Sequence, residues 1–312
     1  MNAHAFFADP HLRQAHVVCN QLGLPLAQVS RMAVVFHLHS PDEKQHWAVK
    51  CFTRPIPERA RRYHGIVEHL GKAGLSCSTG LCYQEQGLYL KDCWYPVLKM
   101  DWVTGQPLDE FLTHRLDQPQ VLLALCRLWL KLEQDLVQAE VIHGDLQHGN
   151  VLVQSGQTVE EMALKLVDYD AMVVPDLAGM VLPEKGHEAF QHPQREQGTT
   201  GTPAIDHFAH LVCFGALRCL AVGGRTWWER HHDGNNLLLQ RADILHPERS
   251  SLLQQLWHSP SEELHFIAGH VARLSRGNLD EVPRLPDLLS DDGFRPLTPE
   301  ERQVATAILG AL

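Results

Sequence analysis

The first hundred residues alternate short apolar runs with polar turns, a pattern typical of β-strands. Residues 32–38 (MAVVFHL) and 46–52 (HWAVKCF) are rich in Val, Phe and Trp, and the turn-like HSPDEKQ separates them. Because such residues favour strands and a short polar turn joins the two runs, the pair predicts a hairpin. Residues 57–70 begin with a proline and repeat apolar positions at helical spacing, which predicts a helix. Further strands are expected at 87–90 and 94–103.

The rest of the chain has a different pattern, dominated by helical spacing. Residues 120–137 (QVLLALCRLWLKLEQDLV) are apolar almost all round, as expected of a helix that is buried on every side. Two short strands are predicted next, at 151–154 and 163–169, joined by the polar segment SGQTVEE. Helices dominate the last third, with polar breaks at 223–236 and 285–293.

The order of strands first and helices afterwards predicts an α+β chain folded as two lobes. We expect a strand-rich lobe over residues 1–103 and a mainly helical lobe over 104–312, which together form one bilobal domain. A junction of this kind is the usual place for a ligand cleft. With 312 residues, 44% of them hydrophobic, the chain is long enough to bury a sizeable core.

Composition narrows the classes of partner and compartment. The formal net charge of −10 argues against general binding to nucleic acid or to an anionic membrane, because both need positive surface. The eight cysteines include no CxxC pair, so they form neither a disulfide framework nor a zinc signature. The N-terminus lacks the features of a secretion signal, and Arg218 interrupts the best candidate for a membrane span. We therefore expect a cytoplasmic protein with no nucleic-acid or membrane partner.

Charged and polar side chains interrupt two apolar stretches, VIHGDLQHGNVLV (141–153) and LKLVDYDAM (164–172). Asp145 and Asn150 lie in a loop that leaves a buried helix and enters a strand, and Asp168 ends the partner strand. Because a hairpin places its strands side by side, we expect Asn150 and Asp168 to be neighbours. Such oxygen ligands suit Mg²⁺, which takes one or two carboxylates together with phosphate oxygens.

These segments resemble a known family. HGDLQHGN and DYD are similar to the catalytic loop and the metal-binding aspartate of the protein-kinase-like phosphotransferases, whose pattern is H-x-D-x-x-x-x-N followed by a strand that ends in Asp. The resemblance implies that Asp145 orients or deprotonates the acceptor hydroxyl. It also implies that Asn150 and Asp168 hold Mg²⁺ and that His143 braces the loop from beneath.

The strand-rich part carries segments that resemble the family's ATP-binding elements. AVK in HWAVKCF is similar to the family's Ala-x-Lys, which makes Ala48 and Lys50 cofactor-binding candidates and implies that Lys50 steadies the α and β phosphates. LKMDWVTGQPLDEFL is similar to the segment that joins the lobes. It implies that Met100 is the gatekeeper and that the backbone from Asp101 to Val103 holds the adenine edge.

Two of the family's ATP-binding features are difficult to place. No glycine occurs from Leu24 to His64, so the glycine-rich loop is missing and close approach of the backbone to phosphate is harder. The helix glutamate that pairs with the strand lysine is expected near Tyr63, which is not acidic. Glu58 and Glu68 each lie about five residues away from it. We take Glu68 as the candidate, and a solvated Glu68 is the alternative.

The end of the activation segment is also recognisable. GHEAFQHPQ (186–194) resembles the family's G-T-x-x-Y-x-x-P-E, although Gln194 replaces the Glu of a buried ion pair. Asp206 resembles the aspartate that ties down the catalytic-loop backbone, at a spacing typical of protein kinases. Gly144 replaces the Arg that reads activation-loop phosphorylation, and no Ser or Thr lies between Asp168 and Gln194. We therefore predict no regulation by phosphorylation of this segment.

Three functions are compatible with these residues. The first is an ATP- and Mg²⁺-dependent phosphotransferase that acts on a protein Ser/Thr hydroxyl, its own hydroxyls included. The second is a pseudokinase that serves as a nucleotide-binding or scaffold module, based on the missing glycine loop and the unplaced glutamate. The third is a small-molecule kinase resembling the aminoglycoside phosphotransferases, based on HGDLQHGN, in which Gln147 stands where Ser/Thr protein kinases have Lys.

Overall fold

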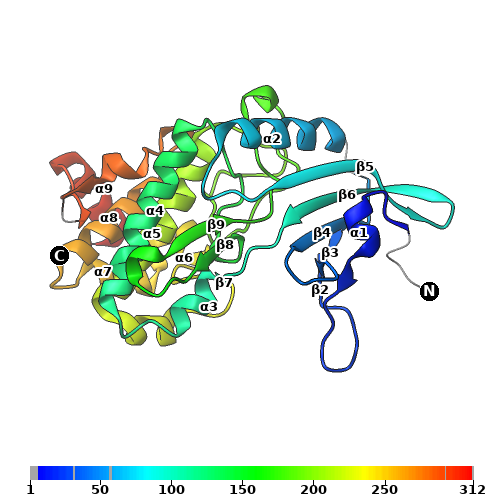
Figure 1. Ribbon diagram of the computed structural model, residues 1–312. Coiled ribbons are helices and arrows are strands. Elements are labelled where there is room, and N and C mark those ends of the chain that lie inside the picture. The colour runs from blue at the N-terminus through cyan, green and yellow to red at the C-terminus, as the bar shows by residue number, and fades with distance from the viewer. Residues whose placement is uncertain (1–5, 31, 56–57, 292, 311–312) are drawn as a thin grey trace. The chain divides into compact units, whose positions relative to one another are not determined.

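Strands fill the N-terminal part of the chain and helices dominate the C-terminal part (Figure 1). The structure is a computed structural model that describes residues 6–30, 32–55, 58–291 and 293–310. The chain divides into two units, which we call unit 1 (Met1–Thr104) and unit 2 (Gly105–Leu312). The arrangement confirms the predicted α+β class.

Unit 1 is built on an antiparallel sheet with the strand order β1-β3-β4-β6-β5, in which β2 also pairs with β3. The predicted hairpin is confirmed, because Ala33 pairs with Phe52 and His39 pairs with His46 across β3 and β4. The strands predicted at 87–90 and 94–103 belong to a longer hairpin of β5 and β6. The six strands are β1 (His16–Val17), β2 (Ala27–Val29), β3 (Ala33–His39), β4 (His46–Phe52), β5 (Leu81–Leu90) and β6 (Cys93–Asp101).

Two helices accompany this sheet. The short helix α1 (Pro10–Gln14) is capped by Asp9, whose carboxylate accepts from the amides of His11 and Leu12. Leu12 is fully buried in a cluster with apolar side chains of the sheet. The predicted helix is confirmed as α2 (Arg59–Ala73), and it ends at Gly74 in the left-handed conformation. Its predicted start at Pro57 lies outside the described residues.

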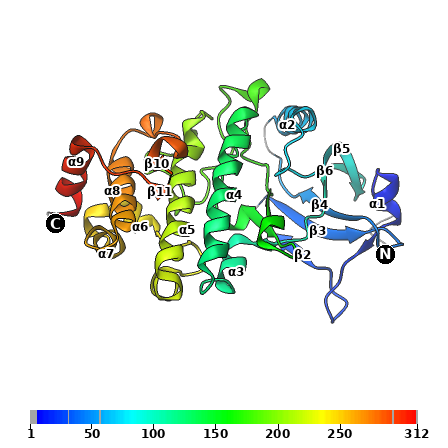
Figure 2. The ribbon, with the colours of Figure 1, turned by 60° about the vertical axis from the view of Figure 1, so that its left-hand side comes forward.

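Unit 2 contains a small sheet and the long helices. The predicted strands pair as expected, with Val151 opposite Leu166, and β7 adds a third strand. Helices α4 and α5 lie side by side (Figure 2). The remaining elements are β7 (Gln106–Pro107), β8 (Val151–Gln154), β9 (Ala163–Leu166), α3 (Leu108–Thr113), α4 (Pro119–Gln138), α5 (Ala204–His231), α6 (Arg241–Leu245), α7 (Ser251–Trp257), α8 (Glu262–Arg276), β10 (Leu289–Ser290), β11 (Gly293–Phe294) and α9 (Pro299–Leu309), with short 3₁₀ turns among them.

The break predicted at 223–236 is confirmed in part. Gly224 in α5 has a non-helical backbone with a φ of 48° and a ψ of −132°, residues 225–231 are helical again, and the helix ends at His231. A Cβ at Gly224 would lie 2.8 Å from the carbonyl oxygen of Leu116, so the bend needs a glycine at this position. By length and composition α5 could cross a membrane, but most of it is buried inside the protein, as in the core helix of a soluble fold.

Candidate active site

The loop 141–150, between α4 and β8, is held by a carboxylate from the first turn of α5. The amide of His143 donates to Asp206 Oδ2 at 2.6 Å, and the amide of Gly144 donates to Asp206 Oδ1 at 3.0 Å. Asp206 is only 5% exposed, and burial raises the pKa of its carboxyl group, against the opposing effect of His143. The prediction that Asp206 ties down the loop backbone is confirmed.

His143 braces the same loop from inside. Its ring is fully buried, and its Nε2 lies 3.2 Å from the carbonyl oxygen of Val167. Its Nδ1 accepts from the amide of Asp145 at 3.3 Å. A neutral ring protonated on Nε2 satisfies both contacts. The predicted bracing role of His143 is therefore confirmed.

The side chain of Asp145 is fixed by contacts on both carboxylate oxygens. Asn150 Nδ2 donates to Asp145 Oδ2 at 3.1 Å and to the Asp145 carbonyl oxygen at 2.8 Å. From the other side, the amide of His187 donates to Asp145 Oδ1 at 2.7 Å. The carboxylate therefore has one defined orientation, as a group that must meet a reacting hydroxyl requires.

Asn150 and Asp168 are neighbours, as the hairpin predicts. The amide of Val167 donates to the carbonyl oxygen of Asn150 at 3.0 Å, and Asp168 follows directly. Asp168 has a φ of 62°, a left-handed conformation that is uncommon for residues other than glycine and is concentrated at functional sites.

This pair fits a magnesium ion bound together with a nucleotide. Both hydrogen bonds from the side chain of Asn150 use its nitrogen, which leaves its oxygen to meet a cation. Within the described residues, no group of three or more His, Cys, Asp or Glu side chains could hold a metal. A cation here would therefore depend on Asn150, Asp168 and phosphate oxygens, which is the kind of ligand set that Mg²⁺ uses.

In unit 1, the candidate residues Ala48, Lys50 and Met100 share one face of the sheet. Lys50 lies in β4, is 6% exposed, and pairs with Leu98 of β6. Ala48 lies two residues earlier in β4 and pairs with Met100. Because side chains two apart, and those of directly paired residues, point to the same side of a sheet, the three side chains face the same way.

The backbone from Asp101 to Val103 has one amide available for an adenine ring. The amide of Asp101 donates to the carbonyl oxygen of Gly80 at 2.9 Å, and the amide of Trp102 donates to that of His46 at 3.0 Å. No described residue accepts from the amide of Val103. Of the predicted hinge amides, only that of Val103 is therefore left to bind an adenine.

The prediction that Glu68 pairs with Lys50 is wrong. The side chain of Glu68 is 62% exposed and pairs with Lys72 at 2.6 Å, one turn further along α2. The other candidate, Glu58, pairs with Arg61 at 3.1 Å. The alternative of a solvated Glu68 is confirmed, because this side of α2 faces water while Lys50 is buried in the sheet.

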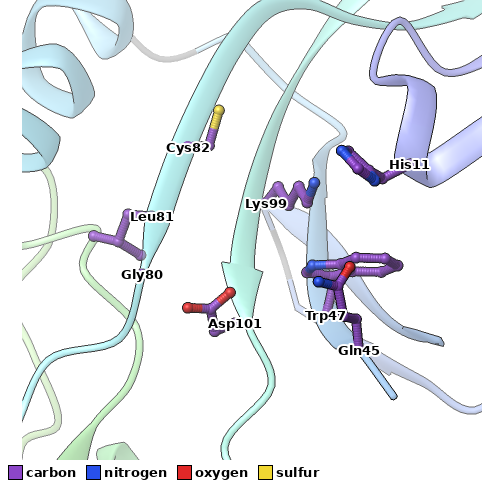
Figure 3. Close-up of a pocket in the computed structure, with 8 residues that line it drawn as sticks. All are labelled: His11, Gln45, Trp47, Gly80, Leu81, Cys82, Lys99 and Asp101. Carbon is purple, nitrogen blue, oxygen red and sulfur yellow. The ribbon is translucent and has the colours of Figure 1, made fainter. Parts of the chain in front are cut away.

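A concave surface of unit 1 lies on the opposite face of the sheet (Figure 3). This cavity of about 340 Å³ is lined by side chains that include those of Trp47 and Lys99. Trp47 directly precedes Ala48, and Lys99 directly precedes Met100. Because neighbouring residues of a strand point to opposite faces of the sheet, the side chains of Trp47 and Lys99 point away from those of the candidates. Lys99 is already paired with Asp9 at 2.9 Å and lies 4.8 Å from the Trp47 ring centroid. We therefore assign this surface to the attachment of α1, although Asp101, one of the candidate nucleotide-binding residues, also lines it.

A comparison with solved structures identifies the fold. The structure titled as the Cydia pomonella granulovirus kinase, PK-1, is similar to this chain with a TM-score of 0.52 and 13% sequence identity, over 89% of this chain and 96% of that chain. The protein has a protein-kinase-like fold. No model of a protein family matches the sequence, and no curated protein matches it. At this identity the likeness shows the fold alone, so the roles of individual residues depend on the geometry.

The kinase-like fold carries an unusual turn where a glycine-rich loop is expected. Ser30 Oγ accepts from the amides of Met32 at 3.4 Å and Ala33 at 3.1 Å, and donates to the Ala33 carbonyl oxygen. Arg31, in the middle of the turn, lies outside the described residues. The amides of Met32 and Ala33 are therefore used inside the protein instead of facing a phosphate.

Two replacements in the catalytic loop have clear structural reasons. Gly144 has a φ of 79°, and a Cβ there would lie 2.4 Å from the carbonyl oxygen of Ala171, so no side chain fits at this position. Gln147 caps the short turn 148–150 by accepting from the amide of Gly149 at 2.8 Å. Neither residue can act as the Arg or Lys that it replaces.

The activation segment contains a residue that sequence analysis missed. Arg195 is fully buried, whereas Gln194, the residue chosen from the motif, is exposed. Gln194 Oε1 does accept a hydrogen bond, from the amide of Leu279 at 2.9 Å. The sequence offered one signal for Arg195, because this residue directly follows the QHPQ of the segment that resembles the end of the activation segment. The residue type alone does not show that its side chain is buried.

Proposed function

We propose that the protein is an ATP- and Mg²⁺-dependent phosphotransferase that transfers the γ-phosphate to a Ser/Thr hydroxyl of a protein, its own hydroxyls included. The observation that carries this proposal is the carboxylate of Asp145, which is held in one orientation by Asn150 and the amide of His187. Asp168 lies two residues beyond the end of β9, directly after Val167, whose amide donates to the carbonyl oxygen of Asn150. These are the residues that phosphoryl transfer by positioning and electrostatics would need.

Each residue would have a defined task. Asp145 would orient the acceptor hydroxyl and accept its proton. Asn150 and Asp168 would hold Mg²⁺, which neutralises charge on the phosphates when it is bound. Lys50 would bind the phosphates of ATP, and the Val103 amide would hold the adenine edge.

The contact of the activation segment with Asp145 favours a protein as acceptor over a small metabolite. The amide of His187, in the segment that resembles the substrate-facing end of protein kinases, touches the carboxylate directly. A reducing compartment such as the cytoplasm suits the protein, because all eight cysteines are free thiols.

We further propose that phosphorylation of the activation segment does not regulate the protein. The only hydroxyl between Asp168 and Gln194 belongs to Tyr169, which is 1% exposed and donates to the carbonyl oxygen of Leu166 at 2.8 Å. Gly144 cannot be replaced by an Arg that would bind a phosphate. A phosphate would have neither an accessible acceptor nor a partner to order the loop.

A nucleotide-binding pseudokinase is the second candidate, and two observations favour it. Glu68 pairs with Lys72 in place of Lys50, and Ser30 occupies the amides of the turn that replaces the glycine loop. Both features lower the expected affinity for nucleotide, and neither involves the loop that carries Asp145.

Melting the protein with and without Mg·ATP, followed by incubation with labelled ATP, separates these functions. A ligand that binds only the folded state raises the melting temperature. We expect a shift with Mg·ATP, label on protein, and loss of the label in Asp145→Asn and Asp168→Asn. Asp176→Asn, an exposed aspartate on a neighbouring turn, is the matched control and should keep the label. A shift without label in any sample supports the pseudokinase, and turnover that needs a small acceptor supports a metabolite kinase.

A further inference from the structure

A charged side chain is buried at the end of the activation segment, where it is energetically costly. Arg195 is 0% exposed. Its Nη1 donates to Gln191 Oε1, and its Nη2 donates to the carbonyl oxygen of Glu184 at 3.4 Å. Burying an arginine costs several kcal/mol unless opposite charge and hydrogen bonds compensate for it. The position of Arg195 therefore calls for an explanation beyond packing.

Three carboxylates act on the charge of Arg195, and two of them belong to the candidate active site. Burial lowers the pKa of Arg195, and the carboxylates of Asp206, Asp145 and Glu184, in that order, oppose this shift. An arginine side chain stays charged in proteins, so it attracts all three. Of these, Asp206 anchors the loop 141–150, and Asp145 is the proposed catalytic group in that loop.

A chain of contacts leads from Arg195 to the orientation of Asp145. Gln191, which accepts from Arg195, lies next to Gly186: a Cβ at Gly186 would be 3.1 Å from the Gln191 side-chain amide and 3.0 Å from Asp145 Oδ1. The following residue, His187, donates its amide to that same oxygen at 2.7 Å. The segment held by Arg195 is thus the segment that orients the carboxylate.

We propose that Arg195 is a positioning residue, which holds the segment 184–191 so that the amide of His187 orients Asp145 without an added phosphate. The proposal rests on the proposed phosphotransferase activity and deepens it. It explains how a loop with glycine at position 144 keeps its activation segment in place: a positive charge already inside the segment attracts Asp145 of the loop and Asp206, which anchors the loop.

Arg241 offers a matched control. It too is an arginine that holds the activation segment, donating to the carbonyl oxygens of Gln191 at 3.0 Å and of Glu188 and Pro193 at longer range. Its carboxylate neighbour is Glu188 and not a residue of the catalytic loop. Substituting Arg241 therefore loosens the same segment without removing charge near Asp145.

The first test measures the rate of label transfer at saturating Mg·ATP for Arg195→Met, Arg195→Lys and Arg241→Met. We expect Arg195→Met to lower kcat by about 100-fold, the effect of misplacing a reacting group by about 1 Å, while KM for ATP changes by less than about twofold. Arg195→Lys should be intermediate, because it keeps the charge but loses the planar fork. Equal losses in Arg195→Met and Arg241→Met at equal melting temperature would overturn the proposal.

A second test does not need turnover. Hydrogen exchange of the backbone amides should rise in Arg195→Met at residues 143–145 and at His187, whereas in Arg241→Met the rise should be confined to 188–193. If Arg195→Met does not fold, Arg195→Lys should show the same pattern with a smaller amplitude. Unchanged exchange at 143–145 and His187 contradicts the role of Arg195. Absence of label transfer in the unaltered protein contradicts only the proposed function.

Discussion

The candidate residues of unit 2 and those of unit 1 differ in how firmly the protein holds them. In unit 2, Asp145 has hydrogen bonds to both carboxylate oxygens, and Asp206 fixes the loop by two backbone amides. In unit 1, the expected ion pair of Lys50 with Glu68 is absent, and Ser30 uses the amides of the turn that would face phosphate.

This difference matches the different sensitivity of reaction rate and nucleotide affinity to the position of a single group. Moving a reacting group by about 1 Å can cost two orders of magnitude in rate. Nucleotide binding adds many small contributions, so the loss of one contact leaves the others in place. We therefore expect the protein to bind nucleotide weakly while its catalytic loop stays ordered, and the following predictions test that contrast.

The largest effect is expected for Asp206→Ala, which removes the anchor of the firmly held loop. It leaves the amides of His143 and Gly144 buried without an acceptor and the charge of Arg195 less compensated. Each unsatisfied buried group costs about 1–3 kcal/mol, so for the two amides we expect a loss of at least about 2 kcal/mol in the free energy of unfolding. Urea denaturation measures it, and Asp176→Ala, at an exposed position, should change it by less than about 0.5 kcal/mol.

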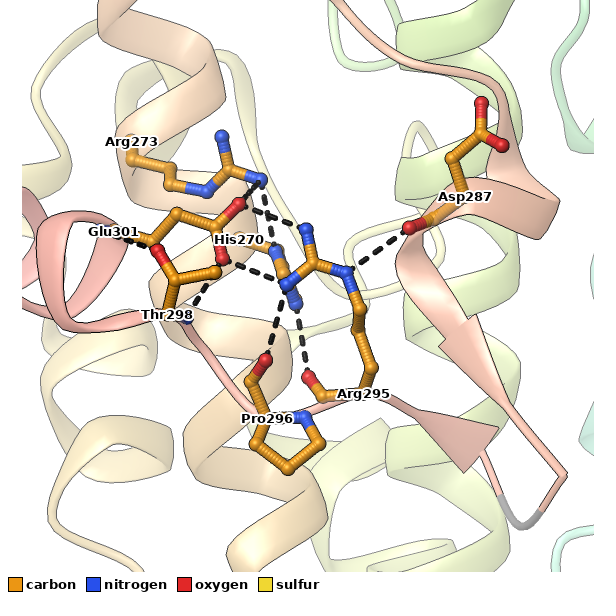
Figure 4. Close-up of polar contacts among 7 residues, drawn as sticks. All are labelled: His270, Arg273, Asp287, Arg295, Pro296, Thr298 and Glu301. Atoms are coloured by element: carbon orange, nitrogen blue, oxygen red, sulfur yellow. Dashed lines mark hydrogen bonds and ion pairs between the residues drawn. The ribbon is translucent and has the colours of Figure 1, made fainter.

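Unit 2 should also lose stability in acid, through Glu301 at the start of α9 (Figure 4). Hydrogen bonds from Arg295, at 2.7 and 2.9 Å, lower the pKa of Glu301 to about 2, helped by the Thr298 amide and Arg273 and opposed by burial. Because the folded pKa lies below the ordinary value of 4.5, the contribution is complete above pH 4.5 and is lost as the pH falls toward 2. Comparing Glu301→Gln with the unaltered protein at pH 7 should show a loss of about 2 kcal/mol, which shrinks at pH 3. An equal difference at both pH values would contradict this assignment.

Gly186→Ala should disturb the orientation of Asp145 without removing a polar group. The new methyl group would press on Asp145 Oδ1, and the backbone has a φ of 77° that favours glycine. We expect kcat to fall by about tenfold, together with a loss of about 1 kcal/mol in stability. Gly179→Ala is the control: its φ of 79° carries a similar backbone cost, but nothing lies within 4 Å of its Cβ. If both variants lose the same activity, contact with Asp145 is not the cause.

Mild acid should also destabilise unit 1, because His37 is partly buried among other histidines. His37 Nε2 lies 3.0 Å from His46 Nδ1, and burial, together with His46 and His39, lowers the pKa of His37. Its folded pKa is below the ordinary 6.5, so its neutral form stabilises unit 1 above that pH, and the contribution is lost as the pH falls below it. His37→Gln should reduce the dependence of melting temperature on pH between 7 and 5. An unchanged dependence would show that His37 does not contribute.

The smallest effect is expected for Glu68→Ala. Because the side chain is exposed and pairs with Lys72, its removal should change the affinity for Mg·ATP by less than about twofold and leave the melting temperature nearly unchanged. Calorimetric titration of each variant with Mg·ATP measures the affinity, and Lys50→Met provides the comparison that should lose binding. A large loss of affinity in Glu68→Ala would restore Glu68 as a partner of Lys50.

Most elements of both units could be predicted from local patterns. The β3–β4 hairpin, helix α4 and the β8–β9 hairpin appear where the hydrophobic periodicity places them, because that periodicity reflects which side chains must leave water. Helix α1 was not predicted, since five residues with a single buried leucine carry no periodic signal. The break predicted at 223–236 is confirmed at Gly224, but residues 225–231 are helical, because the backbone bends at that glycine and the helix then resumes.

The sequence by itself determined the residues of the loop 141–150 and the pairing that makes Asn150 and Asp168 neighbours, because short spacings and hairpin geometry are local properties. Only the tertiary structure decided that Glu68 faces water and that Arg195 is buried, with its guanidinium donating to the side chain of Gln191. Which side of a helix turns inward, and which distant charges meet in the core, depends on the packing of segments far apart in the chain. No local pattern of residue types records that packing.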